Sequence, residues 1–255
     1  MVDIQHLTAG YGGAPVLQDL DLSFHPGELT VIIGPNGCGK STLLRSIVGL
    51  TPKVEGQISM GEANLRSLSP AQLAQRIAYL PQNKQAPDMT AAQLVLHGRF
   101  PYLRYPRRYR QSDRDIAQGA MEALGISHLT DAPVPQLSGG TQQKCYIAMA
   151  LCQDSPVILM DEPLSFLDIS HQLDLMALVR ELARQGKTMV LVLHDLALAL
   201  KWADRLILME KGAIRQTGTP EELVAGGHLE PVFGVRIHSW VSPWGIQYSF
   251  HRKEN

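Results

Sequence analysis

A glycine-rich segment near the N-terminus constrains the fold of this chain more than any other feature. Residues 34–41 read Gly-Pro-Asn-Gly-Cys-Gly-Lys-Ser and fit the pattern G-x-x-x-x-G-K-[ST] completely. A strand-like apolar run, Leu29–Ile33, precedes the segment, and a helical pattern, Ser41–Val48, follows it. This order of strand, loop and helix indicates a phosphate-binding loop. The alternative, a glycine-rich turn that happens to contain a lysine, does not explain these two flanks.

The chemistry of a triphosphate explains the residue types in this loop. Glycines let backbone N–H groups converge on phosphate oxygens without a Cβ in the way. Lys40 supplies charge for the β- and γ-phosphates, Ser41 offers a hydroxyl to Mg²⁺, and the next helix presents its N-terminal end to the same anion. The loop therefore predicts a bound nucleoside triphosphate, and leaves open whether the chain is a kinase, a GTPase or an ATPase.

Composition excludes some partners. The 255 residues are 45% hydrophobic and 18% charged, which allows one large domain or two lobes that share a core. Because 23 Lys and Arg balance 24 Asp and Glu, no global basic field recruits nucleic acid or anionic lipid. The most apolar stretch, residues 189–200, is broken by His194 and Asp195, so we expect no membrane span, which needs about 20 apolar residues.

The ends of the chain and its cysteines indicate the compartment. The first six residues show neither a basic region nor an apolar core, so we expect no signal peptide. The cysteines are odd in number and form no metal-type pair, which predicts free thiols in a reducing compartment. They are Cys38, Cys145 and Cys152.

Two acidic residues follow a second buried strand. Val157–Met160 is continuously apolar and leads directly into Asp161 and Glu162. At the carboxyl end of a parallel strand this pair would lie beside the phosphate loop. Asp161 would then hold Mg²⁺ directly or through water, and Glu162 would polarise the attacking water, a role worth about 10²–10⁴ in rate. An acidic turn that caps a helix is the alternative, and the phosphate loop upstream makes it the weaker one.

Alternating strand and helix patterns after residue 155 predict parallel βα units. Between the two strands that carry these motifs, Thr90–Asp154 is mostly helical, with an interruption at residues 99–110 that is rich in Arg, Tyr and Pro. We therefore expect an α/β core formed by residues 1–89 and 155–227, a helical subdomain at 90–154, and a tail, 228–255, to which the sequence assigns no role.

The segment Leu137-Ser138-Gly139-Gly140 completes a family pattern. Together with the phosphate loop and the acidic pair, it resembles the ATP-binding subunit of an ABC transporter over residues 2–224. The resemblance implies a P-loop NTPase core with an N-terminal antiparallel β-subdomain and an inserted α-helical subdomain. Two departures from the pattern are Thr141, where the family usually has glutamine, and Leu164, where it usually has a small or hydroxyl residue.

The resemblance also implies roles for individual residues. Glu162, His194 and Gln82 would be catalytic, and Mg²⁺ would be held by Ser41, Gln82 and Asp161. The dimer interface would include Ser165, Leu167 and Asp168. ATP would be bound by Tyr11, which stacks on adenine, by Gly34, Pro35, Asn36, Gly37, Cys38, Gly39, Lys40, Ser41 and Thr42, and in trans by Ser138, Gly139 and Gly140.

By the family's arrangement, a second copy of the chain and a membrane permease are the partners. Two copies would sandwich two ATP molecules, and the permease would convert closing and opening into transport. Residues 96–102 and 166–172 resemble importers of iron siderophores, haem and vitamin B12, which also use a periplasmic or surface substrate-binding protein. The expected location is the cytoplasmic face of the cell membrane, as a peripheral subunit held by the permease.

The Arg- and Tyr-rich interruption leaves several interpretations open. Arg99, Arg104, Arg107, Arg108 and Arg110 alternate with aromatic residues and form a solvated surface, a permease contact or a nucleic-acid surface. The last is the weakest because acidic residues follow closely and the net charge is near zero, so no nucleic acid is expected. The alternative function for the whole chain is a soluble ABC-type ATPase in nucleic-acid repair or translation, or a nucleotide-dependent clamp.

Overall fold

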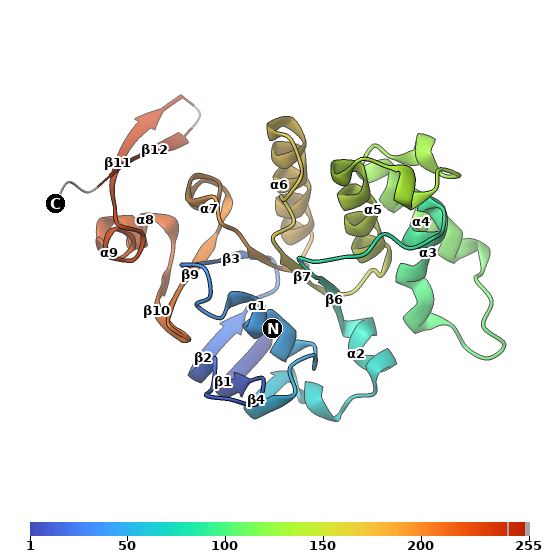
Figure 1. Cartoon of the computed structure of the whole chain (residues 1–255), viewed down its shortest axis with the longest axis horizontal. Helices are drawn as coiled ribbons and strands as arrows, with labels where there is room; N and C mark the ends of the chain where they lie inside the picture. The colour runs from blue at the N-terminus through green and yellow to red at the C-terminus, as the bar shows by residue number, and fades with distance from the viewer. Residues whose placement is uncertain (244, 253–255) are drawn as a thin grey trace. The chain divides into compact units, whose positions relative to one another are not determined.

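The computed structural model of the protein describes residues 1–243 and 245–252 (Figure 1). The chain forms two compact units. Unit 1 comprises Met1–Arg66 and Val190–Asn255, and unit 2 comprises Ser67–Met189. Strand β8 (Thr188–Val192) begins in unit 2 and ends in unit 1. The predicted functional boundaries at residues 90 and 154 stay a prediction.

Unit 1 opens with an antiparallel sheet in the order β2-β1-β4-β5. Every large residue that β1 buries, such as Val2, Ile4 and Leu7, faces the core, while its polar residues are exposed or half-buried. This sheet is the predicted N-terminal antiparallel β-subdomain. Its strands are β1 (Val2–Gly10), β2 (Leu17–Phe24), β4 (Lys53–Met60) and β5 (Ala63–Asn64).

The second sheet of unit 1 has the order β10-β9-β3-β8. β3 is buried at all five positions and pairs in parallel with β9, as expected for a strand covered on both faces. β10 returns antiparallel to β9. The strands are β3 (Leu29–Ile33), β9 (Arg205–Glu210) and β10 (Ala213–Gly218), and the helices are α1 (Lys40–Ile47), α7 (Leu196–Trp202), α8 (Pro220–Ala225) and α9 (Leu229–Phe233).

In unit 2, β6 and β7 pair in parallel, and β7 is buried along its whole length. Three helices, α3, α4 and α5, pack against one another, and short 3-10 helices connect them. The strands are β6 (Ile77–Leu80) and β7 (Val157–Asp161), and the helices are α2 (Pro70–Arg76), α3 (Ala91–Leu96), α4 (Gln111–Ala123), α5 (Gly139–Cys152) and α6 (Ile169–Arg184). The 3-10 helices of this unit are His97–Tyr102, Ser127–Leu129 and Val134–Gln136, and one more, Leu65–Ser67, begins in unit 1 and ends in unit 2.

The tail contains a β-hairpin that the sequence did not assign. β11 (Val235–Ser242) pairs antiparallel with β12 (Gly245–Arg252) in a sheet of two strands. Residue 244 and residues 253–255 of the predicted tail lie outside the described residues. Neither strand buries any residue completely, which explains why no clear apolar alternation marks them.

Two further expectations concern cysteines and membrane spans. All three cysteines are free and buried. Across residues 1–243 and 245–252, the helices are too short or too polar to cross a bilayer.

Candidate nucleotide-binding and hydrolysis site

The phosphate loop of unit 1 has a backbone that requires glycine. Gly34 has φ +151°, and a Cβ there would lie 2.1 Å from the carbonyl oxygen of Met209. Gly39 has φ +106°, and its Cβ would lie 2.6 Å from a methyl group of Leu17. These positions tolerate no side chain, so β9 and β2 approach the loop closely. The loop leaves β3 and enters α1, as the sequence predicts.

Lys40 is held inside this loop. Its side chain is only 5% exposed, and its ammonium donates hydrogen bonds to the carbonyl oxygens of Gly34, at 2.7 Å, and Pro35, at 2.9 Å. The sulfur of Cys38 lies 3.9 Å from the same nitrogen. The loop therefore fixes a positive charge at its centre, where the phosphates of a nucleotide would compete with the two carbonyls.

Tyr11 and His194 are the other predicted ATP contacts in unit 1. Tyr11 is 50% exposed. Burial raises the pKa of its phenol, but hydrogen bonds with Thr42 and Arg45 outweigh that effect and the pKa lies below its usual value. The hydroxyl is thus tied to α1 while half of the side chain stays accessible. His194 lies two residues after the end of β8 and is exposed.

The acidic pair of unit 2 stands at the end of β7. Asp161 is the last residue of the strand and is 2% exposed. Glu162 has φ +53°, a left-handed conformation that is costly for a residue with a Cβ and that clusters at functional sites. The turn directs the chain sharply away from the strand at the residue predicted to polarise water.

The sequence missed Lys84, which lies near this pair. Burial lowers the pKa of its ammonium to about 8, although the charge of Asp161 acts in the opposite direction. Its nitrogen donates to the side-chain oxygen of Gln143 at 2.6 Å. Lys84 follows Gln82 by two residues, but it belongs to no phosphate-binding or acidic motif, so only its neighbours in space reveal it.

The serine-glycine corner starts helix α5. Ser138 is the N-cap, and its hydroxyl accepts from the backbone N–H of Thr141 at 3.3 Å. The Thr141 hydroxyl bonds to the same Ser138 hydroxyl at 2.8 Å, so this departure from the family pattern adds a contact inside the corner. A Cβ on Gly140 would lie 2.9 Å from the carbonyl oxygen of Phe166, which is itself 80% exposed.

The predicted interface loop therefore packs against the corner within unit 2. At its end Asp168 caps α6, because its carboxylate accepts from the backbone N–H of His171 at 3.0 Å. That bond, with a second from the His171 side chain, keeps the pKa of Asp168 below its usual value.

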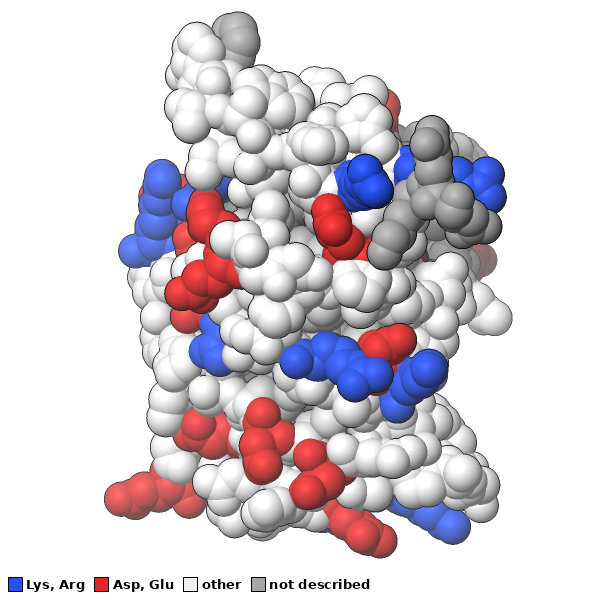
Figure 2. All heavy atoms as spheres, turned by 90° about the vertical axis from the view of Figure 1, so that its left-hand side faces the viewer, with Lys and Arg blue, Asp and Glu red and all other residues white. Residues whose placement is uncertain are grey.

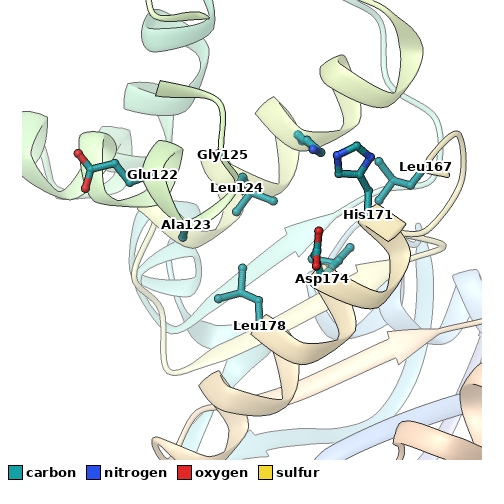
Figure 3. Close-up of a pocket in the computed structure, with 10 residues that line it drawn as sticks. Glu122, Ala123, Leu124, Gly125, Leu167, His171, Asp174 and Leu178 are labelled. Atoms are coloured by element: carbon teal, nitrogen blue, oxygen red, sulfur yellow. The ribbon is translucent and has the colours of Figure 1, made fainter. Parts of the chain in front are cut away.

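Leu167 also lines a cavity of about 400 Å³ (Figure 3). Figure 3 shows His171 and Asp174 on α6, and residues 122–125 at the end of α4, among the residues that line this cavity.

The predicted residues thus fall into two groups. Unit 1 contains Tyr11, residues 34–42 and His194, and unit 2 contains Gln82, Asp161, Glu162, residues 138–140 and residues 165–168. The assembly of both groups around one nucleotide stays a prediction.

In the Arg- and Tyr-rich segment, one arginine is buried and holds the structure together, and other arginines of the segment line a cavity. Arg99 is 9% exposed, and its guanidinium donates to Asp113 at 3.1 Å and to the Cys152 carbonyl at 3.2 Å and stacks on Tyr102 at 4.0 Å. A cavity of about 610 Å³ lies beside it. Arg104, Arg108, Arg110, Tyr105 and Tyr109 are among the residues that line this cavity.

Positive and negative side chains are mixed on the face of the molecule that Figure 2 shows. Figure 2 shows Lys and Arg interspersed with Asp and Glu over one face, in line with a formal net charge of −1.

Comparisons with known proteins agree with the predicted family. The family model described as ABC transporter matches residues 17–165. The ferric enterobactin transport ATP-binding protein FepC of Escherichia coli (strain K12) is 42% identical over 234 residues, which are 91% of this chain and 86% of FepC.

Two solved structures share the fold. A structure described as an inward-facing conformation of a metal-chelate type ABC transporter has a TM-score of 0.83 and 25% identity, and covers 99% of this chain and 97% of that chain. The dimeric ATP-binding cassette MJ0796, bound to ADP and phosphate, has a TM-score of 0.77 and 26% identity. The match covers 86% of this chain and 99% of the MJ0796 chain.

Proposed function

Because this chain belongs to the ABC transporter family as an ATP-hydrolysing subunit, we propose that it powers the import of an iron chelate. The observation that carries the proposal is the similarity to FepC, a ferric enterobactin transport protein, along 91% of the chain. A ferric siderophore is therefore the first candidate cargo, and haem or a cobalamin is the second. A soluble ATPase of nucleic-acid repair or translation is not favoured by these relatives.

In this proposal the loop of unit 1 binds the triphosphate. Lys40 exchanges its two carbonyl acceptors for oxygens of the β- and γ-phosphates, while the amides of residues 37–41 and the start of α1 surround the remaining charge. Tyr11 presents its accessible half to the adenine, and His194 contacts the γ-phosphate. Glu162 accepts a proton from water as that water attacks the γ-phosphorus and ADP departs.

The donor set also fits Mg²⁺. Ser41 offers a hydroxyl at the first turn of α1, Gln82 an amide oxygen, and Asp161 a buried carboxylate, all of them the oxygen ligands that this ion prefers. When bound, Mg²⁺ offsets phosphate charge.

A second copy would complete the site. Ser138 and the amides of Gly139 and Gly140 begin a helix of 14 residues, where backbone donors and the helix dipole favour an anion. The dimeric cassette with 26% identity supports this arrangement in two copies. The exposed Phe166, between interface residues Ser165 and Leu167, would then be covered by the partner.

We further propose that the subunit is peripheral, on the cytoplasmic face of the membrane, and held by permease subunits. A substrate-binding protein would deliver the chelate from the other side. The cavity beside Arg99, with Arg104, Arg108 and Arg110 on its walls, is the surface that we assign to permease contact.

Growth on defined iron sources tests the importer. Cells that carry only the Glu162→Gln chain should fail to grow on one ferric siderophore, or on haem, yet grow normally on a ferrous salt. Chain purified from these cells with Mg-ATP should bring down a membrane protein with several spans. Equal growth on every iron source, or retention of the chain on nucleic acid instead of membrane protein, would contradict the proposal.

A further inference from the structure

Lys84 joins two motifs that the sequence treats as separate. It lies in the irregular segment between β6 and α3, two residues beyond Gln82. Its ammonium donates to the side-chain oxygen of Gln143 at 2.6 Å and lies 5.2 Å from the ring centroid of Tyr146. Gln143 and Tyr146 stand three residues apart on α5, so both face the lysine from one side of that helix.

Gln143 extends the link to the acidic pair. Its side chain is 5% exposed, and its amide nitrogen donates to the carbonyl oxygen of Pro163 at 2.7 Å. Pro163 follows Glu162 directly, so this bond fixes the main chain next to the predicted base. Both ends of one buried amide are thus used, one by Lys84 and the other by the turn after β7.

A third bond reinforces the connection. The hydroxyl of Tyr146, a residue that is 8% exposed, donates to the carbonyl oxygen of Gln85 at 2.5 Å. Helix α5 is therefore attached to the segment that carries Gln82 at two neighbouring residues. Since α5 begins at the serine-glycine corner, any shift of that corner must be transmitted through these bonds or break them.

We propose that Lys84 is a positioning residue for ATP hydrolysis, which holds the serine-glycine helix, the Gln82 segment and the turn at Glu162 as one body. The inference rests on the proposed function of these three elements. Binding of ATP to the loop of unit 1 involves none of these bonds. Loss of the ammonium should consequently leave nucleotide affinity intact and impair the hydrolytic step.

Lys84→Met tests this inference, because it keeps the aliphatic stem and removes the charge and the donor. The matched control is Lys187→Met. Lys187 is a lysine of the same unit whose ammonium donates to Asp154 at 2.9 Å and to the carbonyl oxygen of Ser155 at 3.2 Å, and neither acceptor belongs to one of the motifs. The full-length chain is used throughout, with phosphate release giving kcat and KM, and a fluorescent ATP analogue giving Kd.

We expect kcat to fall about 10–100-fold in Lys84→Met, since a displacement of about 1 Å has effects of that size. Kd should change less than about twofold, and Lys187→Met should match the wild type. Gln143→Glu keeps an acceptor for Lys84 but loses the donor to Pro163, and should lower kcat as well. In the double variant Lys84→Met with Gln143→Glu, the losses should be less than additive, because both act through one link.

The contrary results are distinct from a failure of the proposed function. Wild-type kcat in both Lys84→Met and Gln143→Glu would overturn the inference, and so would a loss of ATP affinity that equals the loss of kcat. If Lys84→Met unfolds below the assay temperature, the kcat of Gln143→Glu alone tests the inference, and a wild-type value would overturn it. A wild-type chain that releases no phosphate would instead contradict the proposed ATPase mechanism.

Discussion

Two lysines, the buried Lys40 of unit 1 and the half-buried Lys84 of unit 2, hold their charge in different ways. Lys40 donates to carbonyl oxygens only five and six residues away in its own loop, whereas Lys84 donates to Gln143, 59 residues along the chain. The first arrangement is local and is specified by a short glycine pattern. The second exists only after β6 and α5 have packed, so the chain's tertiary structure creates it. The comparison separates residues that bind the nucleotide from residues that position the elements of the hydrolytic site.

Lys40→Ala gives the largest expected change and the clearest contrast with Lys84→Met. Two charge-assisted hydrogen bonds to phosphate would be lost, each worth about 1.5–3 kcal/mol, so Kd for ATP should rise about 10²–10⁴-fold. Titration with a fluorescent nucleotide measures this rise. Unchanged ATP affinity would remove residues 34–41 from the phosphate-binding role.

Arg99→Met extends the comparison to a second long-range cation. It would leave the Asp113 carboxylate, whose side chain is 10% exposed, without its ion-pair partner, and should cost about 3–5 kcal/mol of unfolding free energy. The control is Arg215→Met, whose pair with Glu210 at 2.7 Å lies on the surface at 55% exposure, with an expected cost of about 0–1 kcal/mol. Urea denaturation measures both. Equal effects would show that burial of the pair is unimportant.

Gly34→Ala tests the local side of the comparison. The new Cβ would meet the carbonyl oxygen of Met209 at a distance that no real contact shows, so the loop must shift, and we expect a loss of about 2–3 kcal/mol. Gly13→Ala is the control, since its Cβ meets nothing within 4 Å and its φ is not positive. Thermal denaturation measures Tm in both variants. An equal decrease in Tm in Gly34→Ala and Gly13→Ala would contradict the close approach of β9 to the loop.

The acid dependence of stability should show the smallest effect. Burial raises the pKa of Asp113, but the Arg110 backbone N–H and the Arg99 guanidinium outweigh it and hold the pKa below its usual value of 3.8. The folded state therefore binds this proton less readily than the unfolded state. The resulting contribution to the free energy of unfolding is present at pH values well above 3.8 and is lost as the pH falls through the folded-state pKa. Acid denaturation should be less steep in Asp113→Asn, and an identical pH profile would contradict this.

The sequence predicted most of the parts of the fold that have strong local signals. Leu29–Ile33 is a strand with the predicted bounds, and the predicted strand Val157–Met160 lies within β7, because continuous apolar runs leave little choice for a strand buried on both faces. β4 and β10 were not predicted, since their residues are mostly exposed or half-buried.

For the site, the sequence supplied residues but not their connections. The motifs name Gln82, Ser138 and Glu162, but the bonds that join their elements run through Lys84 and Gln143, which belong to none of the motifs. One weak signal existed. A lysine lies within four residues of the end of an apolar strand, after Pro81, and a charged residue in that place needs a polar partner. The pairing partner lies on a distant helix, so no local pattern could have named it.

Trapping the closed state tests the central claim most directly. Glu162→Gln should bind Mg-ATP with wild-type affinity, release almost no phosphate, and elute in size-exclusion chromatography with light scattering at the mass of two chains, whereas without nucleotide it should elute at the mass of one. Adding Lys40→Ala should abolish the dimer. A Glu162→Gln chain that stays monomeric when saturated with Mg-ATP, or that hydrolyses ATP at the wild-type rate, would contradict the account.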